Sequence, residues 1–156
     1  MLAGRPAPRL VLLCGLPGSG KTTLARKLAE EIPAVRLCPD EWMAGLGSDL
    51  YDEEARERLE ALFWKLAQEL LGLGQSVILE SGFWLRSDRD EKRLGAQALG
   101  AAVELHYLDV PIDELCRRVE ARHTDGGAVL ITREQLTGWT ELFEAPDPAE
   151  LELYDG

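Results

Sequence analysis

Short apolar runs alternate along the chain with longer segments in which apolar residues recur at helical spacing. Short runs bounded by polar or turn-forming residues are typical of buried strands. Four such runs are candidate strands, at residues 10–14, 35–38, 76–80 and 103–109. A run at 151–154 is barely long enough to add a fifth. We therefore expect a sheet of four or five strands.

Helical spacing is clearest between the second and third predicted strands. There the apolar residues recur at i, i+3 and i+4, with charged residues on the opposite face. The positions that form this stripe are Leu59, Leu62, Phe63, Leu66, Ala67, Leu70 and Leu71. Other helices are predicted from Leu24 to Pro33, over residues 87–99 with Ser87 as the cap, from Pro111, and from Thr132, where Gln135 completes a capping box.

The alternation of strands and helices predicts a three-layer α/β fold with a mostly parallel sheet. We find no internal repeat and no linker, so we expect residues 1–156 to form a single domain. No apolar run reaches the roughly 18 residues that span a bilayer. The cysteines Cys14, Cys38 and Cys116 are odd in number and widely spaced. This pattern favours a reducing compartment, the cytoplasm, over a disulfide frame or a zinc site.

The net charge of −11 narrows the possible partners. A polyphosphate backbone or an anionic membrane would be repelled at long range. Nucleic acid is therefore an unfavourable partner, and we expect no membrane contact. A neutral or cationic small molecule fits the charge better.

A P-loop follows the first predicted strand and precedes the first predicted helix. The pattern G-x-x-x-x-G-K-T occupies residues 15–22. Glycines allow backbone N–H groups to face phosphate, and the helix N-terminus adds partial positive charge. We expect Lys21 to reach the β- and γ-phosphates and Thr22 to bind Mg²⁺. The predicted nucleotide-binding residues are Gly15, Leu16, Pro17, Gly18, Ser19, Gly20, Lys21, Thr22 and Thr23.

Other P-loop classes lack their own signatures in this chain. No aspartate has glycine three residues later, and the sequence contains no asparagine, which excludes the DxxG and NKxD motifs of GTPases. ATP is therefore the expected nucleotide, with GTP less favoured. The third strand ends in Glu80 and Ser81 rather than the acidic pair of mechanical AAA ATPases. A kinase needs only a base, a lid and arginines near the transferred phosphate.

With these parts the sequence resembles the small bacterial P-loop kinases, such as gluconate kinase, chloramphenicol phosphotransferase, zeta toxin and the kinase domain of polynucleotide kinase. Proteins of this group are often labelled AAA family ATPases. The resemblance implies the strand order 2-3-1-4-5 and a short lid at about residues 123–131. It also implies that an aspartate at the end of the second strand accepts the proton of the acceptor hydroxyl.

Asp40 occupies that place and is the candidate base. The carboxyl end of a parallel strand projects into the crevice where ligands bind. Asp40 could instead cap the following helical turn. The arginine that the family places after this aspartate falls on Met43 here, while Glu41 is expected to be solvated.

Four more residues near the strand ends are candidate substrate contacts: Trp42, Glu80, Trp84 and Arg86. Glu80 could hold Mg²⁺ through water, contact the acceptor, or only pair with an arginine. Trp42 and Trp84 would suit an acceptor with a flat or apolar part, or could simply seal helices onto the sheet. Arg86 is the best match to the acceptor- or phosphate-directed arginine that the family often places after the third predicted strand. Trp64 and Trp139 lie on apolar helix faces and are expected in the core.

The fourth predicted helix ends in arginines that suit a phosphate clamp. Arg118 and Arg122 are spaced i, i+4 and can share one side of the helix. Guanidinium groups bind phosphate through a rigid fork of donors. The resemblance implies a lid role, favoured for Arg122 over Arg118, and Arg122 joins Lys21 and Asp40 as a catalytic candidate.

These residues predict an ATP- and Mg²⁺-dependent phosphotransferase that acts on a hydroxyl of a nucleoside, sugar or antibiotic, as a monomer or homodimer. A nucleotide-switched ATPase or binding module is the alternative, and it would tolerate Asp40→Asn. A kinase of nucleic-acid 5′ hydroxyls is a further alternative, which needs a basic face that this composition does not favour.

Overall fold

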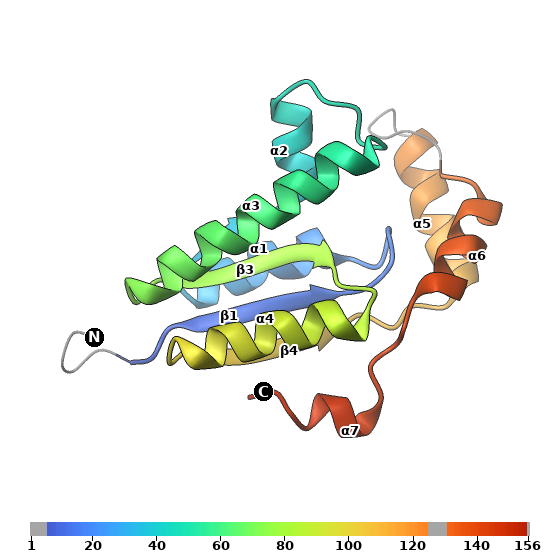
Figure 1. Ribbon diagram of the computed structural model, residues 1–156. Coiled ribbons are helices and arrows are strands. Elements are labelled where there is room, and N and C mark those ends of the chain that lie inside the picture. The colour runs from blue at the N-terminus through green and yellow to red at the C-terminus, as the bar shows by residue number, and fades with distance from the viewer. Residues whose placement is uncertain (1–5, 125–130, 156) are drawn as a thin grey trace.

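The computed structural model describes residues 6–124 and 131–155 (Figure 1). Its strands are β1 (Arg9–Cys14), β2 (Ala34–Leu37), β3 (Ser76–Gly82) and β4 (Ala102–Tyr107). Its helices are α1 (Lys21–Glu31), α2 (Pro39–Gly45), α3 (Glu53–Gly72), α4 (Arg86–Ala98), α5 (Ile112–Thr124), α6 (Arg133–Leu142) and α7 (Pro148–Leu151). Among the described residues, no helix is long and apolar enough to cross a membrane.

The four strands form one parallel sheet in the order β2-β3-β1-β4. Leu10 of β1 lies opposite Val77 of β3 and Val103 of β4, so the strands run in register. All carboxyl ends therefore meet at one edge, where the loop after β1 enters α1. This arrangement confirms the predicted α/β class and the order 2-3-1-4.

Each face of the sheet is buried by a different set of helices, as Figure 1 shows. Val11 and Leu13 of β1 pack with Ala25 and Leu28 of α1 on one face. On the other face, alternate residues of the same strand pack with α3 and α4; this larger core includes Leu10, Leu12, Phe63, Ala67, Leu71 and Ala96. Alternation along β1 between two apolar partners explains why this strand is a continuous hydrophobic run.

Helices α5 and α6 stand at the carboxyl edge of the sheet rather than on a face (Figure 1). Leu16 of the P-loop packs with Leu115 and Val119 of α5 and Leu136 of α6. The expected capping box holds the start of α6, because Thr132 and Gln135 exchange side-chain and backbone hydrogen bonds. The P-loop thus has a separate apolar support beside the sheet core.

Some predicted elements differ from those observed. Residues 148–151 form the helix α7 instead of starting a fifth strand, because Asp147 caps that turn by accepting from the Glu150 N–H. The last described residue, Asp155, reaches the free edge of β4, where its N–H donates to Val103 O at 2.7 Å. Helix α4 begins at Arg86 with Leu85 as its cap, so Ser87 does not cap it.

Candidate active site

The P-loop runs from β1 into α1 in the conformation that its glycines permit. Gly18 and Gly20 have φ of 86° and 100°, the left-handed region that side-chain-bearing residues rarely adopt. Gly15 has no room for a side chain, since a Cβ would lie 2.6 Å from Ser19 Oγ and 3.3 Å from Leu108 O. The backbone is therefore drawn tightly around the N-terminus of α1.

The residues of this loop fit an anion such as a nucleotide phosphate. The hydroxyl of Ser19 is buried and has no hydrogen-bond partner among the described residues. The ammonium group of Lys21 folds back onto the loop and donates to Gly15 O at 2.9 Å and to Leu16 O at 3.1 Å. An ammonium on backbone carbonyls and an unpaired buried hydroxyl are both groups that a phosphate can satisfy.

Burial lowers the pKa of Lys21 to about 8, and the negative charge of Asp40 opposes that shift. Removal from water disfavours the charged form of an amine, so the direction follows from its enclosed position. The effect of Asp40 on this amine also means that the predicted base and the phosphate-binding lysine lie close enough to interact. Lys21 remains mostly protonated at pH 7.

Thr22 is directed at the carboxylate of Glu80, which lies near the end of β3. Its hydroxyl donates to Glu80 Oε1 at 3.0 Å, while Arg36 Nε donates to Glu80 Oε2 at 2.9 Å. The Glu80 side chain is 1% exposed and that of Arg36 is 19% exposed. Arg36 thus neutralises a buried carboxylate whose other oxygen faces the Mg²⁺-binding position predicted for Thr22.

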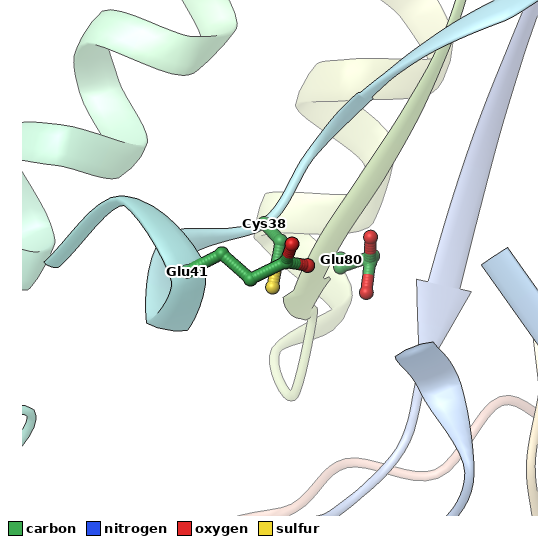
Figure 2. Close-up of side chains that lie close together, drawn as sticks. All are labelled: Cys38, Glu41 and Glu80. Atoms are coloured by element: carbon green, nitrogen blue, oxygen red, sulfur yellow. The ribbon is translucent and has the colours of Figure 1, made fainter. Parts of the chain in front are cut away.

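A second possible metal group lies next to this pair. The Sγ of Cys38 and carboxylate oxygens of Glu41 and Glu80 all lie within 4.8 Å of one another, and Figure 2 shows the three side chains converging. Arg36 contacts both carboxylates, with its Nη2 2.5 Å from Glu41 Oε2. Burial also raises the pKa of the Cys38 thiol to about 11, so it is not a thiolate at neutral pH. Arg36 therefore bridges both carboxylates of this group and supplies a positive charge where a metal ion would otherwise provide it.

One large cavity of about 1630 Å³ opens at the carboxyl edge of the sheet. The P-loop lines it through Gly18, Gly20, Lys21, Thr22 and Thr23, while α2, α3, the start of α4, α5 and α6 supply the remaining walls. A pocket for one small ligand is typically about 300–1,000 Å³. The cavity is large enough for two substrates side by side.

Asp40 lines this cavity from the first turn of α2. Its carboxylate pairs with Arg56 of α3, with Arg56 Nη2 2.5 Å from Asp40 Oδ1. The same arginine donates to Leu50 O at 3.0 Å, which fixes its direction. The Asp40 side chain is 65% exposed and Cys38 is the cap of α2, so Asp40 does not serve as the helix cap. It is oriented by Arg56 and open to the cavity.

Arg118 and Arg122 of α5 both line the cavity. Arg118 reaches the P-loop, where its Nη1 donates to Gly18 O and to Ser19 O, each at 3.3 Å. Its Nε donates to Glu114 Oε1 at 3.0 Å, which holds the side chain over the loop. Arg122 lines the wall one turn further on. Most of the expected lid, residues 125–130, lies outside the described residues.

The aromatic and basic candidates divide between the cavity and its surroundings. Trp84 lines the cavity and donates from Nε1 to Gly15 O at 3.3 Å. Trp42 does not line it: it is 45% exposed and packs edge-on against Phe63, with ring centroids 4.9 Å apart. Arg86 also lies outside the lining and pairs with Asp90, which does not fit an acceptor contact. Both residues therefore lie away from where the sequence predicted them.

Several cavity residues were not predicted as part of the site. Trp64 and Trp139 were expected in the core; each packs against a core cluster and also lines the cavity, where the ring centroids of Trp139 and Trp84 are 6.0 Å apart. Arg56 and Glu60 were not candidates either. Both continue the stripe of Phe63 and Ala67 towards the start of α3, so polar residues on a core-facing stripe were a signal that they enclose a ligand.

Comparison with known proteins places this geometry among kinases. A family model described as AAA domain (AAA_33) matches residues 10–146. The chain is 30% identical to adenylyl-sulfate kinase of Myxococcus xanthus (strain DK1622) over 97% of its length and 84% of that protein. It is also 30% identical to shikimate kinase of Thermobifida fusca (strain YX), over 76% of this chain and 66% of that one.

Among solved structures, a chain of the Pnkp1/Rnl/Hen1 RNA repair complex is similar, with a TM-score of 0.73 and 25% identity. The alignment covers 98% of this chain and 48% of that chain, so the present chain spans about half its length. The matching family model covers most of this chain and includes the P-loop, Asp40 and the α5 arginines. The chain belongs to the AAA_33 family of P-loop kinase domains.

Proposed function

We propose that this protein transfers the γ-phosphate of ATP, with Mg²⁺, to a hydroxyl group of a small molecule. The observation that carries the proposal is that one cavity contains both the P-loop with Lys21 and the carboxylate of Asp40. The geometry supports a phosphate-binding surface at the P-loop, with Asp40 as the proposed general base and space between them. A transfer reaction needs all three.

In this proposal the P-loop backbone and Lys21 bind the nucleotide phosphates, and Arg118 and Arg122 approach them from α5. Thr22, with Glu80 behind it, is the residue to hold Mg²⁺, which would neutralise charge on the phosphates. Fixed donors aimed at developing negative charge account for much of the acceleration in such sites. The Glu80–Thr22 hydrogen bond at 3.0 Å supports this placement of the metal.

Asp40 accepts the proton of the acceptor hydroxyl while the oxygen of that hydroxyl forms a bond to the γ-phosphorus. The bond between that phosphorus and the β,γ-bridging oxygen breaks, and ADP leaves with the bridging oxygen. Arg56 acts through Asp40 as a positioning residue, because its contact with Asp40 Oδ1 orients the carboxylate. The products are ADP, a phosphate monoester and one proton.

The test is a screen for phosphorylated product by mass spectrometry, with ATP, Mg²⁺ and a panel of nucleosides, amino sugars, sugars and antibiotics. We expect acceptor-dependent ADP release that Lys21→Ala abolishes and that Lys27→Ala, on the exposed side of α1, leaves intact. If ADP release is slow, equal with every acceptor and insensitive to Asp40→Asn, the protein is a nucleotide switch instead of a kinase.

A further inference from the structure

The acceptor end of the cavity is strongly acidic. The carboxylates that line this end are Asp40, Glu53, Glu57, Glu60, Asp88 and Glu91, and the bases are Arg56 and Lys92. Glu80 also reaches the cavity, but Arg36 neutralises it from behind. Both bases on this side already have acidic partners, since Arg56 pairs with Asp40 and Lys92 with Glu91. The acceptor end therefore carries more acidic than basic groups.

Glu60 of α3 and Asp88 of α4 come from different helices and are two of the four lining carboxylates, with Glu53 and Glu57, that no described ion pair neutralises. No ion pair among the described residues includes either of them. Glu60 is half-buried, and burial raises its pKa to about 7, with Asp88 and Glu57 adding to the rise while Arg56 and Lys92 oppose it. A partly desolvated carboxylate that senses a second acid gains most from a cationic ligand.

Aromatic rings complete the same walls. Trp64 follows Glu60 by one turn of α3. Trp84 lies in the loop before α4, the helix that contains Asp88, and Trp139 packs against Trp84. Lys92 Nζ lies 5.3 Å from the centre of the Trp64 ring, so one face of this ring already holds a cation of the protein itself. Tryptophan faces beside carboxylates are a favourable setting for an ammonium group attached to an apolar or flat body.

We propose that the phosphoryl acceptor is an organic cation, a hydroxyl compound with a protonated amine that binds Glu60 and Asp88 and an apolar or flat part that binds Trp64 and Trp84. The inference rests on the proposed function, whose acceptor class it specifies. Adenylyl sulfate and shikimate, the acceptors in the names of the two relatives, are anions at neutral pH. An acidic acceptor end repels such anions and attracts a protonated amine, and both effects contribute to specificity.

The experiment uses two sets of compounds that differ mainly in charge. Phenylethanolamine, phenylethylene glycol and mandelate share a phenylcarbinol skeleton and are cationic, neutral and anionic; glucosamine, glucose and gluconate form the second set. Binding is measured by calorimetry, and transfer by mass spectrometry with ATP and Mg²⁺. The variants are Glu60→Gln and Asp88→Asn, and the matched control is Glu69→Gln, an exposed carboxylate on α3 outside the cavity.

We expect the amines to bind at least about 10-fold more tightly than their neutral and anionic counterparts, as a charge-assisted hydrogen bond predicts. Each variant should weaken amine binding by about 10-fold, with neutral members and the Glu69→Gln control unchanged. If the amines bind in this way but are not phosphorylated, the result supports a cation-binding acceptor end. The proposed phosphotransfer is then tested by the wider panel of acceptors described above.

Transfer that depends on Lys21 but prefers a neutral or anionic member overturns the inference while the proposed function stands. The inference is also overturned if neither amine binds, or if Glu60→Gln and Asp88→Asn leave amine binding unchanged. Transfer to a 5′-hydroxyl oligonucleotide in preference to every amine overturns it as well and identifies a nucleic-acid acceptor. The two failures are therefore distinguishable by whether any product forms.

Discussion

The two ends of the cavity are built in different ways. The nucleotide end consists mainly of backbone: left-handed glycines, the N-terminus of α1 and carbonyls that hold Lys21 and Arg118. The acceptor end consists of side chains from separate segments, including Asp40 of α2, Glu60 of α3 and Trp84 of the loop before α4. A backbone site recognises phosphate in any nucleotide, whereas a side-chain site can change its specificity without altering the fold.

The two ends meet at the end of β3. Gly82 O accepts from the Gly15 N–H at 3.0 Å, and Trp84 Nε1 donates to Gly15 O. Glu80 lies two residues before Gly82, and its carboxylate accepts a hydrogen bond from the Thr22 hydroxyl. One short segment therefore supports both substrates, and changes on either side of it test how independent the two ends are.

The largest expected effect is on chemistry at the acceptor end. Asp40→Asn removes the proposed base but keeps the shape of the side chain, so we expect kcat to fall by about 10²–10⁴-fold with little change in nucleotide affinity. Steady-state kinetics and titration with a non-hydrolysable ATP analogue measure the two quantities. Asp49→Asn is the control, because Asp49 only accepts from the Tyr51 N–H in a turn, which asparagine does equally well. Equal losses in kcat and nucleotide affinity would mean that Asp40 belongs to the nucleotide end.

The sequence predicted the nucleotide end of the cavity better than the acceptor end, because the two ends are built differently. The P-loop is encoded by consecutive residues after a buried strand, so its chemistry and its position come from the same short segment. The acceptor end depends on how α3 is placed: its second half packs on the sheet through Ala67 and Leu71, while its first half lines the cavity. That division is a tertiary property, which periodicity alone does not reveal.

Single residues illustrate the same point. Trp42 and Trp84 both follow strand ends, but Trp42 lies within α2 and packs onto Phe63, whereas the left-handed Phe83 at φ 49° redirects the chain before Trp84. Arg86 matched a family position, but its guanidinium forms an ion pair with Asp90 one turn later in α4. Local competition for partners decided these orientations.

The second prediction concerns the pair behind the metal position. Arg36→Gln leaves the buried carboxylate of Glu80 without its cation, which typically costs about 3–5 kcal/mol. We expect the free energy of unfolding in urea to fall by about 3 kcal/mol. Arg58→Gln, which removes an exposed pair with Glu54, should change it by less than about 1 kcal/mol. If the two variants are equally stable, Arg36 does not compensate Glu80.

A third prediction tests the junction between the two ends. Gly82 and Gly74 have nearly equal φ, 87° and 84°, but a Cβ on Gly82 would lie 3.1 Å from Trp84 Nε1 and 3.2 Å from Gly15 O, while one on Gly74 would meet nothing within 4 Å. Gly74→Ala should therefore cost only the left-handed strain, about 1–2 kcal/mol. Gly82→Ala should cost about 1 kcal/mol more and weaken nucleotide binding. Equal costs, measured by urea unfolding, would show that the junction relaxes freely.

The smallest effect concerns the pH dependence of the nucleotide end. Because burial lowers the pKa of Lys21 to about 8, the amine is mostly charged at pH 7 and mostly neutral at pH 9. Phosphate binding needs the charged form, so the Kd for a non-hydrolysable ATP analogue with Mg²⁺ should rise by up to about 10-fold between these pH values. Lys21→Arg stays charged and should show a flat profile, whatever its affinity at pH 7.

Folding stability without nucleotide should respond to the same group in the opposite direction. The folded-state pKa, about 8, lies below the ordinary value of 10.5, so the unfolded chain binds more protons between these values. Stability contributed by Lys21 therefore rises with pH through this window, while nucleotide affinity falls. Urea unfolding of the wild type and Lys21→Arg at pH 7 and 9 isolates this contribution as the difference between them. A wild-type profile that parallels Lys21→Arg in both measurements would mean that Lys21 is not desolvated, and that the nucleotide end is as open to water as the carboxylate of Asp40.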